Sequence, residues 1–559
     1  MTVDLETLDF LFRMGDKAPT ISPRTHKNRE AIVTNRDRKN KMSVNRRDFI
    51  KETAAGVGFA AAAGSGLLSE GIAQAGTAES GAWQGTVPKI QPSQIKETIT
   101  TDVVVVGMGI SGMCAALSAI DGGAKTTILE KGANNNARGF DDGCINSSVH
   151  KEAGVNINRE ELIGELMKQA NYRVDQRLIT TWVDKSGEAI DWLRAKVEPK
   201  GQKPTVAGAS YSMVQAGQDQ EGPYKVYRTA VNWPGMNAAI MSLVEAEIKE
   251  KGGDIRFNTP AVQLVREGNG RVTGVIAKTA GGANIRFNAR KGIILSCGGY
   301  DNNPEMMKKY LRPSDLRIEK FNSQNQLCTG DGHNMGLAIG ADMDEPPHCM
   351  IVGNGVIKGK VEFYTVMFTA FLRVDKMGRR YVNEDSDYCR AANANSVLPG
   401  AFHWSVLDSS NDAATQQLTR HVTSGAIFAA DTVEELANKM EVDPKVFKAT
   451  IDRYNQMAKN KKDEDFGTHA EKMRPVVKAP FYAMQVRNFS LVTISGLKIN
   501  ENMQVLDKEG KVIPGLYASG NTSGGFFADT YPRNVHGISH GRAITFGRLA
   551  GKHAAAQKG

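Results

Sequence analysis

One stretch decides the fold of this chain: Val103-Val104-Val105-Val106-Gly107-Met108-Gly109-Ile110-Ser111-Gly112. Four β-branched residues predict a buried strand, and they run directly into a Gly-x-Gly-x-x-Gly pattern. The alanine-rich run from Met113 to Ile120 predicts a helix, and Thr127-Ile128-Leu129 predicts a second strand that ends at Glu130. An acid 23 residues after Gly107 completes the pattern of a βαβ dinucleotide-binding unit.

Each glycine of this pattern has its own task in such a unit. Gly107 permits the tight turn, Gly109 lets the backbone approach a pyrophosphate, and Gly112 lets the helix pack on the strand. The helix N-terminus offers N–H groups to phosphates, and Glu130 can accept hydrogen bonds from a ribose diol. We therefore expect a dinucleotide site here; a glycine-rich turn in an ordinary α/β domain is the alternative.

The first 75 residues are predicted to be an N-terminal extension with an export signal. Ser43 to Lys51 contains Arg46-Arg47 and resembles a twin-arginine signal, followed by a weakly apolar stretch and small residues at Ala73-Gln74-Ala75. The alternative is an amphipathic helix that happens to contain Arg-Arg. Met42 is a plausible start, so residues 1–41 are expected to be a start assigned too early or a disordered extension. The twin-arginine translocase would export the folded protein to the periplasm or another extracytoplasmic, envelope-associated location.

Length and composition narrow the class of protein. A chain of 559 residues accommodates two or more domains, and its formal net charge of +9 is mild. No run of Lys and Arg predicts a nucleic-acid partner, although a basic rim could dock an acidic redox partner. Cys-x-x-Cys and Cys-x-x-Cys-His are both missing, so we expect no zinc, iron–sulfur or other metal site and no c-type haem. The cysteines are scattered: Cys114, Cys144, Cys297, Cys328, Cys349 and Cys389.

The rest of the chain alternates between helical and strand patterns. Helices are expected within 158–196, at 235–251, at 333–339, within 430–465 and at 541–556. Strands are expected at 254–257, 261–266, 272–277, 292–296 and 511–520, with Asn269-Gly270 as a hairpin turn. Thr432-Val433-Glu434-Glu435 predicts a capping box at a helix start.

Five motifs occur in the order of one known family. They are Gly107–Gly112 with Glu130-Lys131, Leu295–Gly299, Thr329–Gly332, Gly515–Gly520 and Thr545–Gly551. This set resembles the FAD-dependent fumarate reductase/succinate dehydrogenase flavoprotein superfamily. The resemblance implies an α/β fold with non-covalent FAD: a discontinuous Rossmann-like FAD-binding domain at 97–347 and 491–559, and an inserted α+β capping domain at 348–490. The active site would lie between them, over the flavin ring.

The resemblance also assigns cofactor contacts by register. It implies that FAD is held by residues of the glycine motif, the acid after the second strand, the Thr-Gly-Asp-Gly stretch and the last helix. These are Gly107, Gly109, Ser111, Gly112, Glu130, Lys131, Asp331, Gly520, Asn521, Gly537 and Ser539.

The active-site register is closer to the 3-ketosteroid dehydrogenases than to the fumarate reductases. Fumarate reductases carry a catalytic Arg four residues after the Glu of an Asn-Glu motif, where this chain has Tyr388, and they carry a His pair where this chain has Leu491–Gly496. Ketosteroid dehydrogenases place a catalytic Tyr at the position of Tyr388 and a second one at that of Tyr531. One departure is Arg533–Gly537, which replaces a shorter glycine-rich turn and adds a cation.

This register predicts reduction, or formation, of a C=C bond conjugated to a carbonyl, with flavin N5 hydride transfer. Tyr531 would donate a hydrogen bond to the carbonyl oxygen and Tyr388 would carry the proton. Arg390 or Arg533 would assist Tyr388 or bind an anionic group. Tyr388 as a core residue and Tyr531 as a turn residue are the structural alternatives.

Two other functions stay open. One is a fumarate-type enoate reductase with a carboxylate clamp built from Arg390 and Arg533. The other is a flavoprotein that serves only as an electron-transfer or assembly subunit. The expected partners are a small-molecule substrate with an activated C=C and a separate cytochrome or quinol-linked protein in anaerobic electron transfer.

Overall fold

The computed structural model describes residues 87–206, 220–221, 224–320, 327–357, 361–362, 369–410, 413–419 and 421–559. By their contacts, residues 1–81 and 82–559 form separate units, and the predicted extension and export signal lie outside the described residues. In the described part of the chain, no helix is long and apolar enough to cross a membrane. Nor does any group of His, Cys, Asp and Glu there come together as a metal site.

The predicted βαβ unit is confirmed. It consists of β1 (Ile95–Val106), α3 (Ile110–Asp121) and β2 (Thr126–Leu129). β1 lies between β2 and β11 (Asn284–Leu295) and is parallel to both. Val103 to Val106 are at most 5% exposed, because both faces of a central parallel strand are covered.

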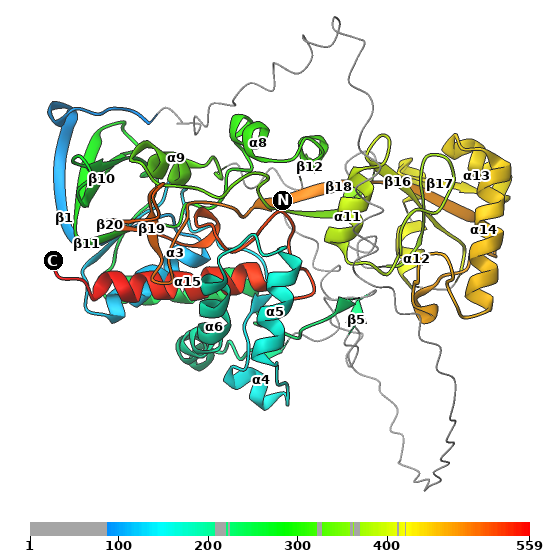
Figure 1. Ribbon diagram of the computed structural model, residues 1–559, viewed down its shortest axis with the longest axis horizontal. Helices are drawn as coiled ribbons and strands as arrows, with labels where there is room; N and C mark the ends of the chain where they lie inside the picture. The colour runs from blue at the N-terminus through cyan, green and yellow to red at the C-terminus, as the bar shows by residue number, and fades with distance from the viewer. Residues whose placement is uncertain are drawn as a thin grey trace, which may run out of the picture. The chain divides into compact units, whose positions relative to one another are not determined.

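Strands from both halves of the chain share one eight-stranded sheet (Figure 1). Its main path runs β19-β20-β11-β1-β2-β8. β20 (Val512–Ala518), from the C-terminal part, pairs in parallel with β11. The other members are β8 (Asp254–Arg256), β9 (Ala261–Arg266), β10 (Val272–Lys278) and β19 (Gln504–Leu506). The Rossmann-like sheet is therefore built from discontinuous stretches of chain.

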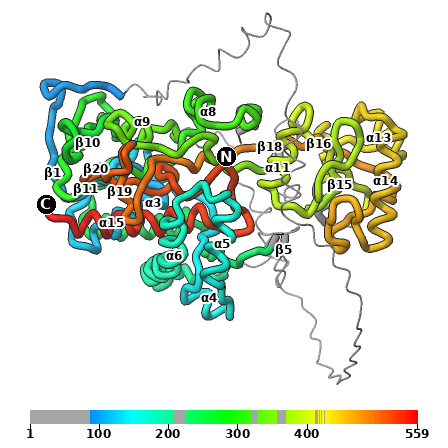
Figure 2. Tube along the Cα trace, viewed as in Figure 1, coloured from blue at the N-terminus to red at the C-terminus, as the bar shows by residue number. Residues whose placement is uncertain are grey.

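The last helix, α15 (Ile538–Ala555), packs directly on α3, and Figure 2 lets the reader follow it beside that helix. A Cβ added at Gly547 would lie 2.3 Å from the carbonyl oxygen of Ser111, and one at Gly551 would lie 2.1 Å from that of Ala115. The two glycines stand one helical turn apart and let the helix backbones touch. α15 begins three residues before the predicted start.

Further helices cover this sheet or extend from it. They are α4 (Ser148–Glu152), α5 (Arg159–Gln169), α6 (Gln176–Val197), α7 (Met236–Glu250), α8 (Pro304–Tyr310) and α9 (Asp331–Ala338). A small antiparallel sheet of β3 (Asp142–Gly143), β4 (Thr205–Val206) and β7 (Ala230–Asn232), and a hairpin of β5 (Gln220–Glu221) and β6 (Tyr224–Lys225), were not predicted. Strands of two or three residues are too short to show an alternating pattern.

A second, seven-stranded sheet is built around one long strand, β18 (Phe481–Thr493). β18 pairs with β12 (Glu319–Lys320), β13 (Met350–Ile357), β16 (Phe402–Leu407) and β17 (Ile427–Ala430). β15 (Leu372–Val374) adds to β16, and β14 (Val361–Glu362) adds to β13. The expected α+β cap corresponds to this sheet and its helices, and its bounds at 348 and 490 stay a prediction.

Helices α13 (Val433–Met440) and α14 (Pro444–Lys459) cover one face of this sheet, and α11 (Tyr388–Ser396) and α12 (Ala413–Thr419) complete its helices. Leu372, Val374 and Trp404 pack with the two covering helices. Thr432 caps α13 as predicted, because its Oγ1 accepts a hydrogen bond from the Glu435 backbone (3.1 Å). The second half of the predicted box differs: the Glu435 carboxylate accepts from the backbone N–H of Asp431.

Candidate active site

The glycine motif turns at the carboxyl end of β1. Gly107 has φ +99°, and a Cβ there would lie 2.3 Å from the carbonyl oxygen of Ser296, so only glycine fits the turn. Gly109, in contrast, has no atom within 4 Å of the Cβ position. Open space at the N-terminus of α3 fits the pyrophosphate of a dinucleotide.

The acid after β2 is buried against the same turn. One oxygen of Glu130 accepts a hydrogen bond from the Met108 backbone and the other from the Gly132 backbone, both at 2.7 Å. Each carboxylate oxygen keeps a second lone pair, which suits a ribose diol. The ammonium of Lys131 donates to Asp331 (2.7 Å) and Thr329 (2.8 Å), so the end of β2 is tied to the start of α9.

A cluster of hydroxyl groups joins three distant stretches of sequence. The Oγ atoms of Ser111 and Ser296 each lie 2.8 Å from the Oγ of Ser519. Gly520 follows with φ +61°, and a Cβ there would lie 2.9 Å from that of Ser111. The structure thus brings the predicted Ser111 and Gly520 together. Ser296 and Ser519 lie inside the quoted motifs Leu295–Gly299 and Gly515–Gly520, but neither was singled out as a site residue.

The N-terminus of α15 reaches the same region. Gly537 is its N-cap with φ +71°, and a Cβ there would lie 2.7 Å from the backbone nitrogen of Gly143. The backbone N–H of Ser539 donates to the hydroxyl of Tyr531 (3.4 Å). The helix start therefore links two predicted cofactor residues to a predicted catalytic tyrosine.

Tyr388 and Arg533 meet although 144 positions separate them in the sequence. The guanidinium carbon of Arg533 lies 5.1 Å from the ring centre of Tyr388, in a cation–π arrangement. Tyr388 is the first residue of α11, whose N-cap Asp387 accepts hydrogen bonds from the backbone N–H groups of Cys389 and Arg390. Arg533 and Tyr531 are only 5% and 6% exposed.

Burial controls the protonation of Tyr388, Tyr531 and His536. Burial raises the pKa of Tyr388 well above its ordinary value, and Arg533 acts in the opposite direction. Burial likewise raises the pKa of Tyr531, again against the influence of Arg533. Burial and the Arg533 charge lower the pKa of His536 to about 3. At neutral pH both tyrosines are therefore protonated and His536 is neutral.

Arg390 belongs to a bridge between α11 and α5. Its Nη1 bonds to Asp387, and its Nη2 donates to the Oε1 of Gln169 (2.8 Å). The amide nitrogen of Gln169 donates in turn to the side chain of Asn534 (2.7 Å). Of the two predicted arginines, Arg533 therefore contacts the Tyr388 ring, and Arg390 connects α11 to the loop that carries Arg533.

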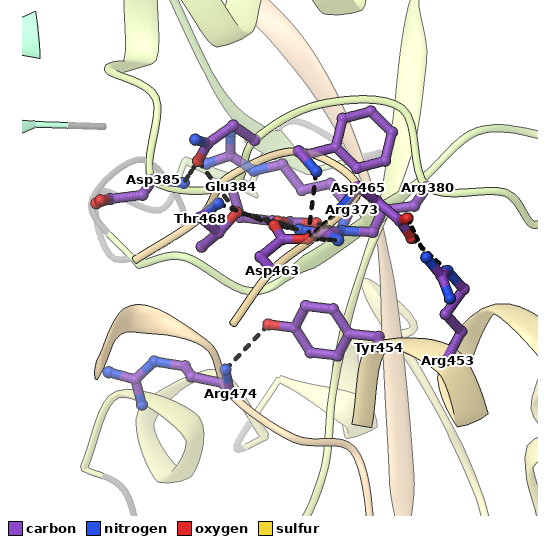
Figure 3. Close-up of polar contacts among 12 residues, drawn as sticks. Arg373, Arg380, Glu384, Asp385, Arg453, Tyr454, Asp463, Asp465, Thr468 and Arg474 are labelled. Carbon is purple, nitrogen blue, oxygen red and sulfur yellow. Dashed lines mark hydrogen bonds and ion pairs between the residues drawn. The ribbon is translucent and has the colours of Figure 1, made fainter. Parts of the chain in front are cut away.

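The Asn-Glu motif before Tyr388 anchors the backbone (Figure 3). Both oxygens of Glu384 bind the guanidinium of Arg380, at 2.8 and 2.5 Å. The same guanidinium binds both oxygens of Asp463, at 2.8 and 2.6 Å. All three side chains are at most 5% exposed, and Thr468 adds a hydrogen bond to Glu384 (2.9 Å). This network fixes the segment that leads to Tyr388.

One buried cation near the site was not predicted. Arg542 of α15 is fully buried, and its guanidinium carbon lies 4.7 Å from the ring centre of Phe527. It donates to the carbonyl of Gly520 (3.0 Å) and the side chain of Asn521 (3.3 Å), which places the predicted Asn521. Burial lowers the pKa of Arg542 to about 10, against the influence of Asp344. The sequence signal that could have identified Arg542 is a charged residue between two small ones, in Gly541-Arg542-Ala543.

Comparison with known proteins agrees with this geometry. Residues 102–536 match the family described as FAD binding domain. The vinyl phenol reductase of Lactiplantibacillus plantarum is 29% identical over 493 residues, which cover 81% of this chain and 96% of the relative.

Two solved structures are also similar. The open conformation of a flavocytochrome c3 fumarate reductase has a TM-score of 0.63 at 26% identity and covers 82% of this chain and 79% of its own. A 3-ketosteroid-Δ4-(5α)-dehydrogenase from Rhodococcus jostii RHA1 has a TM-score of 0.67 at 22% identity, over 84% of this chain and 99% of its own. The second likeness concerns the fold alone. Together with the family match, these findings establish that the chain belongs to the FAD binding domain family and is an FAD-dependent oxidoreductase of the class that acts on CH–CH groups.

Proposed function

We propose that this protein reduces a C=C bond conjugated to a carbonyl, with proton transfer by tyrosine. The observation that carries the proposal is the contact between the half-buried Tyr388 and the buried Arg533, at 5.1 Å from guanidinium carbon to ring centre, beside Tyr531. Relatives named as a vinyl phenol reductase and a fumarate reductase support a C=C substrate.

The chain's own residues would divide the remaining chemistry among them. Reduced FAD, when bound, would supply hydride chemistry at one carbon of the double bond and would be oxidised in return. Tyr388 gives its phenolic proton to the other carbon, so that a hydride and a proton together add two hydrogen atoms. The hydroxyl of Tyr531 donates a hydrogen bond to the substrate oxygen, and the charge of Arg533 stabilises negative charge that develops there.

The protonation state of Tyr388 is compatible with reduction. Burial raises the pKa of Tyr388, so the phenol holds its proton at neutral pH. A protonated phenol is ready to act as an acid, whereas dehydrogenation needs a base at the same position. Tyr388 is therefore in the protonation state that the reductive direction requires.

A fumarate-type carboxylate clamp is less well supported. Such a clamp would use Arg390 and Arg533 together, but Arg390 is already bound by Asp387 and Gln169. A pure electron-transfer role would not require the contact between Tyr388 and Arg533. Reoxidation of the reduced flavin by a panel of enones, 4-vinylphenol and fumarate separates the three functions, because a pure electron-transfer subunit responds to none of these compounds.

Replacing Tyr388 by Phe tests the proposed acid. The ring and its packing stay, and only the hydroxyl is lost, so FAD content should not change. Turnover of the accepted enone should fall by roughly 10²–10⁴-fold, as for other lost general acids. Stopped-flow reoxidation of the reduced flavin by the substrate measures this step.

Tyr172→Phe is the matched control, since Tyr172 is 71% exposed and should leave turnover unchanged. Oxidation of the reduced flavin by an artificial one-electron acceptor should survive in both variants, because it needs no proton from Tyr388. Wild-type turnover by Tyr388→Phe would make Tyr388 a packing residue.

We also propose export by the twin-arginine pathway and electron supply from a separate cytochrome or quinol-linked protein. The support for export is Arg46-Arg47 ahead of an apolar stretch. Changing both arginines to lysine should retain the protein in the cytoplasm, as measured by cell fractionation, whereas Lys51→Arg in the same segment should not. Normal export of the double variant would contradict the pathway.

A further inference from the structure

A row of polar side chains crosses one face of the seven-stranded sheet. β15 and β16 pair so that Arg373 lies opposite Ser405. On the other side of β15, Val374 bridges Arg380, which places Tyr381 opposite Arg373. Residues opposite each other in antiparallel strands share a face, so these three side chains stand side by side. The rings of Tyr381 and His403, 5.8 Å apart, confirm that His403 belongs to the same row.

The two terminal nitrogens of the Arg373 guanidinium are buried without an acceptor. The residue is 1% exposed, and within the described ranges neither Nη1 nor Nη2 has a hydrogen-bond partner. The hydroxyl of Tyr381 is also buried and unpartnered there. A buried charge without a counter-charge is costly, and native structures nearly always satisfy such groups.

The polar side chains next to Arg373, those of His403, Ser405 and Asn395, already form hydrogen bonds with one another or with Asn488. The side-chain Nδ2 of Asn395 donates to Oδ1 of Asn488 (2.9 Å), so Oδ1 of Asn395 is left to accept from Nδ1 of His403 at 3.2 Å. Nε2 of His403 therefore accepts the hydroxyl proton of Ser405 at 3.0 Å. Burial and the charge of Arg373 hold the pKa of His403 well below its usual value, so this ring is neutral and adds no charge.

The carboxylate of Glu384, the acid that reaches this row, is already bound to other groups. An oxygen of Glu384 contacts the backbone N–H of Arg373 at 3.4 Å, but its carboxylate is held by Arg380 and Thr468. Among the described residues, no ion pair joins Arg373 to a carboxylate. The row therefore presents one positive charge with N–H donors, and the hydroxyl donor of Tyr381, to the interior of the protein.

We propose that a small monovalent anion of the size of chloride binds between the guanidinium of Arg373 and the hydroxyl of Tyr381. It supplies both the negative charge and the acceptor that the protein lacks at this place. A neutral water would satisfy one or two donors and leave the charge unbalanced. This anion site lies beside the segment 380–388 that leads to Tyr388, and it is independent of the proposed catalytic step.

The test is the thermal unfolding of the FAD-loaded protein in sodium chloride or bromide against sodium gluconate, at constant ionic strength. Gluconate is too large to enter. A ligand that binds the folded state raises the unfolding midpoint, by roughly 1–2 °C for a chain of this size at a tenfold excess over its Kd. We expect a saturable rise with chloride and bromide, no rise in Arg373→Met, and roughly tenfold weaker binding in Tyr381→Phe.

Arg379→Met is the matched control, because the Arg379 side chain is 64% exposed on the same segment and its loss should leave the chloride response intact. A bromide-soaked crystal should show an anomalous peak between Arg373 and Tyr381. If Arg373→Met does not fold, the chloride response of Tyr381→Phe and the anomalous bromide peak test the proposal instead. Equal midpoints in chloride and gluconate, an unchanged response in the variants, or no bromide peak would overturn the proposal. None of these readouts depends on turnover.

Discussion

At the scale of single residues, a substitution at Gly109 separates the effect on cofactor binding from the effect on folding. Its Cβ position has no protein atom within 4 Å, so a larger side chain meets no part of the chain itself. The same space fits the cofactor's pyrophosphate. Gly109→Leu should therefore fold but purify colourless, with FAD content measured by absorbance after denaturation and folding by circular dichroism.

Gly164 of α5 provides the control for this change, because its Cβ position is equally open and it lies on an exposed helix face. Gly164→Leu should keep a full complement of FAD. If Gly109→Leu also kept it, the pyrophosphate could not lie at the start of α3.

At the scale of elements, the contact between α15 and α3 sets opposite expectations for two similar substitutions. Alanine in place of an exposed helical glycine, as in Gly164→Ala, should stabilise by about 0.5–1 kcal/mol. Gly551→Ala should instead destabilise by about 1–3 kcal/mol, because its Cβ would lie 2.1 Å from the Ala115 carbonyl oxygen. Urea denaturation of both variants measures the difference, and a stabilised Gly551→Ala would mean that the helices do not touch there.

Elements with a strong local pattern were the ones that the sequence predicted well. β1, α3 and β2 follow from a β-branched run, three glycines and an acid, and α7 follows from its helical spacing. β18 was not foreseen, because its thirteen residues mix apolar, amide and basic side chains with no clear alternation. Pairing with four other strands, and not its own pattern, makes this segment a strand.

At the scale of the whole described unit, the sequence identified candidates and the fold supplied their partners. Tyr388 and Tyr531 were predicted through the family register and Arg533 as a departure from it, and neither kind of prediction carries distances. Their contact, like that of Lys131 with Asp331, joins residues more than a hundred positions apart, so no local pattern could show it. The network of Arg380 with Asp463 was missed for the same reason. The assignment of catalytic and cofactor residues stays a prediction.

The pairing of β13 with β18 limits how the cap can move. β12 already pairs with β18 in the seven-stranded sheet, and the chain then enters the expected cap through β13 and returns through β18. β13 and β18 form one antiparallel ladder from Met350 opposite Thr493 onward. Both covalent connections thus run through a single hydrogen-bonded ribbon. Such a ribbon bends readily across its flat face and resists twisting and shear. We therefore expect the cap to open for substrate entry by a swing about one axis and to return to the same register each time it closes.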